Sequence, residues 1–168
     1  MWYRNIPVSY VRSFAFGVED SLVSTVGLLS GIAIVGMGSA AIFITGMVLI
    51  FVEAFSMAVG SFLSEHLAED YAKQAEMPLR HSLFSGVVMF LSYFISGFIP
   101  LFPYAVMPVA SALWTSILLS LAALFLLGVI GAKMSHIGII RNSLRTLTIG
   151  GIAIIIGVIV GRTISVLI

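Results

Sequence analysis

The stretch SLVSTVGLLSGIAIVGMGSAAIFITGMVLIFV, residues 21–52, contains no charged residue over 32 positions. One membrane-spanning helix needs about 20 mostly apolar residues to cross the roughly 30 Å hydrocarbon core of a bilayer, so this stretch is too long for a single span. The sequence Gly36-Met37-Gly38-Ser39 near its middle is typical of a break between helices. We therefore expect one helix at about 14–36 and a second at about 40–64, with a polar continuation possible beyond Ser64.

The rest of the chain has the same character. Of its 168 residues 60% are hydrophobic and 9% are charged, against about a quarter charged in an average soluble domain. Its mean hydropathy is +1.18. This composition excludes a soluble globular protein and predicts an integral membrane protein.

Three further spans follow from the remaining apolar runs. Residues 82–132 form an uncharged run of 51 positions, in which Pro100, Pro103 and Pro108 mark the expected turn. We expect helices at about 82–102, 109–132 and 146–168. The fold class is thus an all-α membrane protein, a single transmembrane domain over 1–168 with five transmembrane helices and a short cytoplasmic segment at 65–81.

The positions of lysine and arginine predict the orientation. These residues are retained on the cytoplasmic side of a membrane. Seven of the eight fall before the first helix, between the second and third, and between the fourth and fifth: Arg4, Arg12, Lys73, Arg80, Lys133, Arg141 and Arg145. The eighth, Arg162, lies near the end of the last span, where we expect it to extend to the far interface. We therefore expect a cytoplasmic N-terminus and a C-terminus on the far side. The first 20 residues lack the pattern of a cleaved signal peptide, and we expect none to be removed.

Several classes of function are disfavoured. A net charge of +1, from eight basic and seven acidic residues, does not suit a nucleic-acid binder. The chain has no cysteine, which excludes disulfides and thiolate metal sites. It also lacks a phosphate-binding loop, an HExxH motif and a serine-histidine-aspartate arrangement, so we expect no enzyme.

Two acidic residues fall within predicted spans. A carboxylate near the bilayer centre costs about 2.5 to 3.5 kcal/mol on insertion scales, so such residues are candidates for a function. Asp20 is one, although it would also suit the membrane interface. Glu53 lies deeper, 12 positions before Glu65, and could instead hold helices together through hydrogen bonds.

Met57 lies one helical turn beyond Glu53, and Gly60 or Ser61 continues the same face. A carboxylate beside a thioether fits a borderline transition metal such as Fe(II) better than Ca²⁺ or Mg²⁺. Methionine is also a common gap filler in apolar helices. We interpret Met37, Met47, Met89, Met107 and Met134 as packing residues.

Weaker metal candidates lie near the cytoplasmic end. Glu65 with Glu69, and His66 with Asp70, are four residues apart and would lie on adjacent helical faces. Such pairs can bind a divalent ion, but a solvated helix extension would look the same. Glu19, beside Asp20, and Ser61 complete the set of weaker candidates.

Four segments together resemble the vacuolar iron transporter family, which moves ferrous iron or manganese out of the cytosol. VEDSLVSTVGLLSGIA and VEAFSMAVGSFLSEH are similar to the signatures of the first and second helices of that family. SGFIPLFPY resembles the end of its third helix, and SLRTLTIGGIAIIIGVIVGR its last helix. The resemblance covers nearly the whole chain.

The resemblance implies a homodimer in which helices one and two build a metal path driven by proton exchange. It assigns Asp20 and Met57 as metal ligands and Glu53 as a ligand or proton carrier. It implies no permanently bound cofactor, only Fe²⁺ or Mn²⁺ as substrate and protons as the coupling ion. The expected setting is the bilayer of a prokaryotic-type inner or plasma membrane rather than an organelle, without nucleic acid as a partner.

The chain departs from the family pattern at two places. Ser61 and Phe62 follow Gly60 where an acidic residue and a tyrosine are usual. Only about 15 residues stand where eukaryotic members carry a large cytoplasmic metal-binding domain, so this is a short form. Our hypothesis is export of Fe²⁺ or Mn²⁺ by proton antiport. A non-transporting sensor or assembly protein that binds a metal or a partner is the alternative, and a transporter of another small solute is a third reading.

Overall fold

The computed structural model describes the backbone of residues 7–167 and the side chains as far as Thr163. Within these residues the chain forms five helices and no strand: α1 (Val8–Ile34), α2 (Ser39–Lys73), α3 (Leu79–Val106), α4 (Val109–Ser135) and α5 (Ile139–Leu167). All five contain a stretch long and apolar enough to cross a membrane. The predicted all-α fold with five membrane-spanning helices is therefore confirmed. Arg4 and Ile168 lie outside the described residues.

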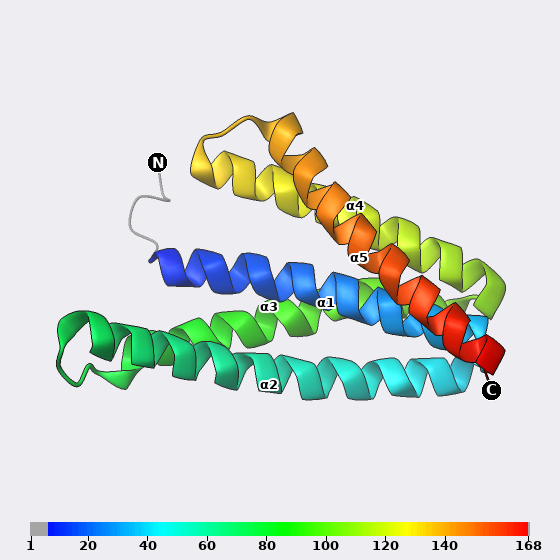
Figure 1. Cartoon of the computed structure of the whole chain (residues 1–168), viewed down its shortest axis with the longest axis horizontal. Coiled ribbons are helices and arrows are strands. Elements are labelled where there is room, and N and C mark those ends of the chain that lie inside the picture. Colours follow the sequence, from blue (N-terminus) through cyan, green and yellow to red (C-terminus); the bar gives the residue numbers. More distant parts are fainter. Residues whose placement is uncertain (1–6, 168) are drawn as a thin grey trace.

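The helices run alternately up and down, joined by short turns (Figure 1). The α2–α3 and α4–α5 turns lie at the same end of the molecule as the start of α1, and α5 ends at the other. Helices α1, α2 and α3 run side by side, whereas the α4–α5 hairpin diverges from α1 towards the end that holds the start of α1. The lysine and arginine residues that predict the cytoplasmic side therefore lie at one end of the described chain.

The turn between α1 and α2 lies where the glycine pattern predicts it. Helix α1 ends at Ile34 and α2 begins at Ser39. Gly36 has a φ of +88°, a left-handed conformation that L side chains rarely adopt. The break in the uncharged stretch is thus made by a residue without a side chain.

The turn between α3 and α4 is shorter than the three prolines suggest. Pro100 and Pro103 lie inside α3, which continues to Val106, so the prediction of a turn beginning near residue 103 is wrong. Both prolines are fully buried, and Ser116 Oγ of α4 donates a hydrogen bond to the Pro100 carbonyl at 2.7 Å. Packing against neighbouring helices lets a membrane helix tolerate proline. Pro108 ends α3 instead, because the residue before a proline avoids helical geometry.

The other helices also extend past the predicted spans. Helix α1 begins at Val8 rather than near residue 14, and α2 continues to Lys73 through the polar segment. Helix α5 begins at Ile139 rather than near residue 146. Hydrophobicity thus predicts only the apolar part of each helix, and the described helices continue beyond it.

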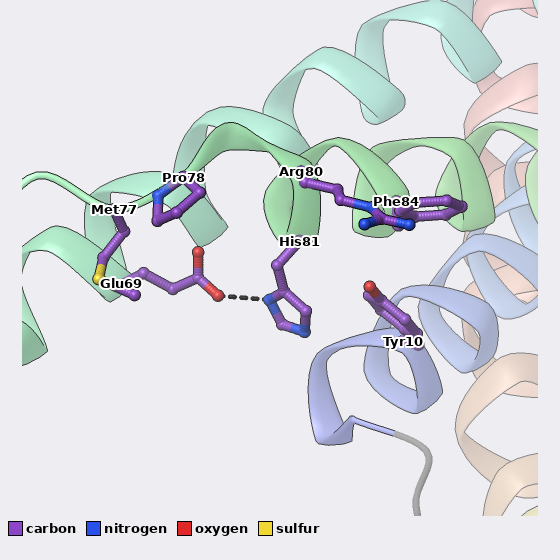
Figure 2. Close-up of a pocket in the computed structure, with 7 residues that line it drawn as sticks. All are labelled: Tyr10, Glu69, Met77, Pro78, Arg80, His81 and Phe84. Carbon is purple, nitrogen blue, oxygen red and sulfur yellow. Dashed lines mark hydrogen bonds and ion pairs between the residues drawn. The ribbon is translucent and has the colours of Figure 1, made fainter.

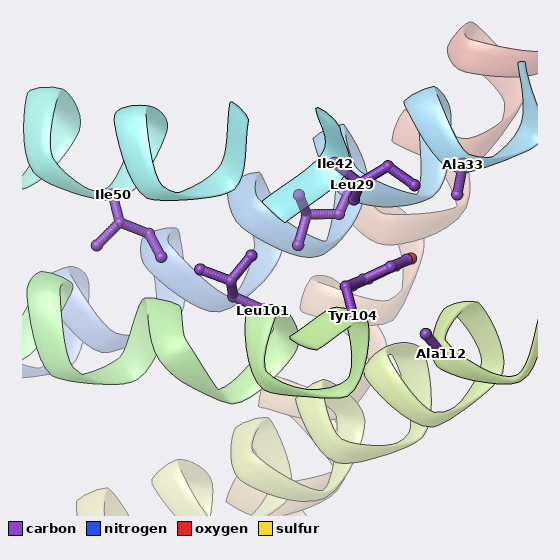
Figure 3. Packing of buried hydrophobic residues seen from close by; sticks show 7 residues of the cluster. All are labelled: Leu29, Ala33, Ile42, Ile50, Leu101, Tyr104 and Ala112. Atoms are coloured by element: carbon purple, nitrogen blue, oxygen red, sulfur yellow. The ribbon is translucent and has the colours of Figure 1, made fainter. Parts of the chain in front are cut away.

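Helix α1 is the centre of the bundle and is the most buried of the five spans. At the end of the molecule near the α1–α2 turn it packs into an apolar cluster with α2, α3 and α4 (Figure 3). The cluster consists of Leu29, Ala33, Ile42, Ile50, Leu101, Tyr104 and Ala112. Towards the opposite end the contacts of α1 with α2 and α3 become polar, and the candidate residues lie there.

Candidate functional site

Asp20 of α1 and Glu53 of α2, the two carboxylates predicted inside the membrane, are brought together. Both side chains are half-buried, and their charges interact electrostatically. Two like charges on neighbouring helices repel one another strongly in a medium of low dielectric constant. The arrangement is therefore suited to a bound cation.

Tyr93 of α3 lies with these carboxylates and was missed by the sequence analysis. Its side chain is fully buried, and its hydroxyl forms a hydrogen bond of 2.8 Å with Ser24 Oγ of α1. The hydroxyl also interacts electrostatically with Asp20 and Glu53. A buried tyrosine usually finds a partner for its hydroxyl, so a tyrosine inside an uncharged span was the available signal.

Met57 lies in a cavity of about 690 Å³ between α1 and α2, one helical turn beyond Glu53. Asp20 and Glu53 do not line this cavity. The structure therefore divides the three main candidates into two adjacent places, a carboxylate pair and a cavity with a thioether. Exposed hydroxyls of Ser56 and Ser64 on α2 line the same cavity.

Ser61 also lines the cavity, but its hydroxyl is held by neighbouring serines. Ser61 Oγ lies 3.0 Å from Ser13 Oγ of α1 and 3.3 Å from Ser85 Oγ of α3, and those two are 2.8 Å apart. The three buried hydroxyls join α1, α2 and α3 at one level. At the position where the resemblance predicts an acid, this chain thus has a neutral contact between helices.

Arg12 of α1 marks one end of the cavity, where it forms an ion pair with Glu65 of α2. The Glu65 side chain is only 12% exposed, whereas that of Arg12 is 62% exposed. Glu65 lies one helical turn beyond Ser61 on α2. Glu65, the acid one helical turn from the neutral Ser61, thus already has a cationic partner in Arg12.

Glu69 and His81 extend this polar region to the ends of α2 and α3. His81 Nδ1 bonds to Glu69 Oε1, as Figure 2 shows, and Ser82 Oγ donates to Glu69 Oε2 at 2.9 Å. One ligand atom from each of Glu65, Glu69 and His81 lies within 4.8 Å of the others. Two carboxylates and an imidazole are a donor set that suits divalent transition metals. His81 was not among the predicted candidates, because the sequence does not show that the α2–α3 turn places it beside Glu69.

Two weaker candidates do not join these groups. Asp70 accepts a hydrogen bond of 2.8 Å from the Met77 backbone N–H, and this bond stabilises the α2–α3 turn. Within α2, Asp70 Oδ2 also lies 3.6 Å from His66 Nε2. Glu19 is half-buried on α1, and no described residue forms a hydrogen bond or ion pair with it.

Comparison with known proteins identifies the family. The model of the VIT family matches residues 11–80 and 66–162, which together cover α2, α3 and α4 and most of α1 and α5. The chain belongs to the VIT family. The search of curated proteins gave no match.

Membership of the VIT family agrees with the resemblance carried by the four sequence segments. Membership of the VIT family indicates a membrane protein that transports metal ions. Residues 66–80, which hold Glu69 and Asp70, fall within both matched ranges.

Proposed function

We propose that this protein moves a divalent transition metal, Fe²⁺ or Mn²⁺, across the membrane and out of the cytosol in exchange for protons. The observation that carries the proposal is the pair Asp20 and Glu53, which interact electrostatically between two membrane-spanning helices of a VIT family member. Carboxylates inside a membrane are costly, and they commonly mark an ion pathway.

The donor atoms favour a transition metal over Ca²⁺ or Mg²⁺. Carboxylate oxygens at Asp20 and Glu53 suit any divalent cation, but the adjacent Met57 thioether favours softer ones. Ca²⁺ and Mg²⁺ prefer oxygen ligands and would gain no binding energy from the thioether sulfur. The combined set is best suited to borderline ions such as Fe²⁺.

Proton exchange follows from the same carboxylates. Their mutual repulsion is relieved when they share a divalent cation, and it is equally relieved when they take up protons. Release of the metal on one side and of protons on the other couples the two fluxes without additional groups.

The polar region around Arg12, Glu65, Glu69 and His81 would be the cytoplasmic entrance. It lies at the same end as the lysines and arginines of the connecting segments, which favours that side as cytoplasmic. A cation arriving there would meet carboxylate and imidazole donors before it reaches the cavity. This orientation also suits a prokaryotic-type inner or plasma membrane.

A homodimer is the proposed working unit. On α2, Ser56, Gly60 and Ser64 are exposed, line the cavity and continue the face of the half-buried Glu53. Small and hydroxyl-bearing residues on a membrane helix allow a second helix to approach closely. A second copy packed on this face would close the cavity and shield Glu53 from lipid.

Flux measurements test the proposal. In proteoliposomes we expect uptake of Fe²⁺ or Mn²⁺ that depends on a proton gradient. Because protons leave as the metal enters, the pH of the vesicle lumen should rise. Asp20→Asn and Glu53→Gln should each bring uptake close to background because the neutral side chains remove the cation-binding charge. Glu76→Gln, in the exposed α2–α3 turn, is the matched control and should transport normally. Wild-type activity in both carboxylate variants would overturn the proposal.

The bonds of Ser61 favour a second candidate, a membrane protein that binds metal without transporting it. A neutral, hydrogen-bonded serine replaces the usual acid and ties three helices together. Metal binding to Asp20 and Glu53 without any flux would select this alternative. Flux that persists when metals are chelated would instead indicate another small solute.

A further inference from the structure

We propose that Met89 of α3 joins Met57 in a two-thioether subsite, and that this subsite selects softer cations. Both side chains line the cavity between α1 and α2. The inference rests on the proposed transport function and adds a residue and a basis for metal selectivity to it.

The position of Met89 depends on a missing side chain in α1. Met89 lies on α3 and is only 4% exposed. A Cβ atom built on Gly17 of α1 would lie 3.1 Å from the Met89 sulfur and 3.1 Å from the Met89 carbonyl oxygen. Contacts that short are tighter than those of nearly all real Cβ atoms, so residue 17 leaves the space that the thioether uses. Met89 is thereby the one residue of α3 among the described residues that line this cavity, and the others belong to α1 and α2.

The other donors around the cavity make sulfur important there. None of the described residues that line it is acidic, and Arg12 adds a positive charge at one end. A cation between the entrance carboxylates and the Asp20–Glu53 pair would therefore have only neutral donors, namely serine hydroxyls and two thioethers. Hard ions such as Mn²⁺ gain little from thioether sulfur, whereas Cu⁺, Ag⁺ and, to a smaller degree, Fe²⁺ gain more.

Methionine also fills irregular gaps in apolar cores, and the test must separate the two roles. Leucine has nearly the volume of methionine and usually substitutes with little loss of stability, but it has no sulfur. Met57→Leu and Met89→Leu therefore remove the donor and keep most of the packing. Met47→Leu is the matched control, because Met47 is a partly buried methionine of α2 that packs against the cluster of Leu29 and Leu101.

The experiment uses the full-length protein in chloride-free proteoliposomes, with Ag⁺ as a soft probe and Mn²⁺ as the transported ion, because Fe²⁺ would reduce Ag⁺. Inhibition of Mn²⁺ uptake by Ag⁺ is measured, and the ratio of Fe²⁺ to Mn²⁺ uptake is measured separately without Ag⁺. We expect Met89→Leu to raise the half-inhibitory Ag⁺ concentration at least about tenfold, since even the loss of a group that only supports a ligand costs that much in metal affinity, and to lower the ratio of Fe²⁺ to Mn²⁺ uptake. Met47→Leu should change neither quantity.

X-ray absorption of bound Ag⁺ separates failure of the subsite from failure of transport. Two sulfur neighbours in the wild type, and one in either single variant, would support the subsite even if no flux were measured. Wild-type Ag⁺ sensitivity and unchanged sulfur coordination in Met89→Leu would overturn it, whatever the outcome of the flux assay for Asp20 and Glu53.

Discussion

At the scale of single residues, Tyr93 is the least expected member of the site. Its side chain is fully buried, and its hydroxyl bonds to Ser24 of α1 and interacts electrostatically with Asp20 and Glu53. The sequence reveals carboxylates in a span because charge is rare there. A tyrosine can serve as an aromatic filler or as a polar donor, and the difference depends on which atoms surround its hydroxyl.

Removal of the Tyr93 hydroxyl should therefore impair transport more than folding. Tyr93→Phe keeps the ring, so we expect a loss of stability of about 1 kcal/mol from one hydrogen bond. Metal flux should fall about tenfold, because we expect the hydroxyl to orient the carboxylates, and loss of such an orienting partner costs at least that much at metal sites. Tyr104→Phe is the control, since Tyr104 is a buried tyrosine of α3 within the apolar cluster. Equal flux in both variants would contradict a role for the Tyr93 hydroxyl.

At the scale of helices, the sequence predicts how many there are better than it predicts where they end. Uncharged runs indicate the spans because burying charge in lipid is costly, and all five predicted spans form helices. Pro100 and Pro103 did not end α3; both are fully buried, and Ser116 of α4 donates a hydrogen bond to the Pro100 carbonyl, a packing between helices that no local pattern reveals. Met89 was interpreted as a packing residue, because its position at the cavity depends on Gly17 of another helix, which no local pattern reveals.

The packing of α5 on α1 gives a prediction with an internal control. A Cβ on Gly157 would lie 2.9 Å from the Gly27 Cα atom, which belongs to backbone that cannot easily move. A Cβ on Gly27 would lie 3.7 Å from the Gly157 Cα atom, an ordinary contact. Gly157→Ala should thus destabilise the protein by about 1–3 kcal/mol through overpacking. Gly27→Ala should be tolerated, and thermal unfolding in detergent distinguishes the two.

The ion pair between Arg12 and Glu65 couples α1 to α2 across one end of the cavity. Because Arg12 is largely exposed, we expect a coupling energy of only about 1 kcal/mol from a cycle of Arg12→Ala, Glu65→Gln and the double variant. Arg12→Ala should destabilise the wild type more than it destabilises Glu65→Gln. Additive effects in thermal unfolding would show that the pair does not join the helices.

At the scale of the whole molecule, the absence of cysteine makes the proposed dimer directly testable. Gly60→Cys places a single thiol on the exposed face of α2 beside the cavity. Across a two-fold interface the two thiols would lie close together, so oxidation in membranes should yield a covalent dimer. Leu118→Cys, on α4 and 65% exposed, should remain a monomer. Equal cross-linking of both variants would point to random collision rather than a defined interface.

The orientation of the molecule can be tested with the same cysteine-free background. His136 lies in the α4–α5 turn, at the end that carries most of the basic residues, and Met37 lies in the uncharged α1–α2 turn at the opposite end. The positive-inside rule places the first end in the cytoplasm. In intact cells a membrane-impermeant thiol reagent should therefore label Met37→Cys at once and His136→Cys only after permeabilisation. The reverse pattern would move Glu65, Glu69 and His81 to the far side, and the metal would then leave the membrane where we propose that it enters.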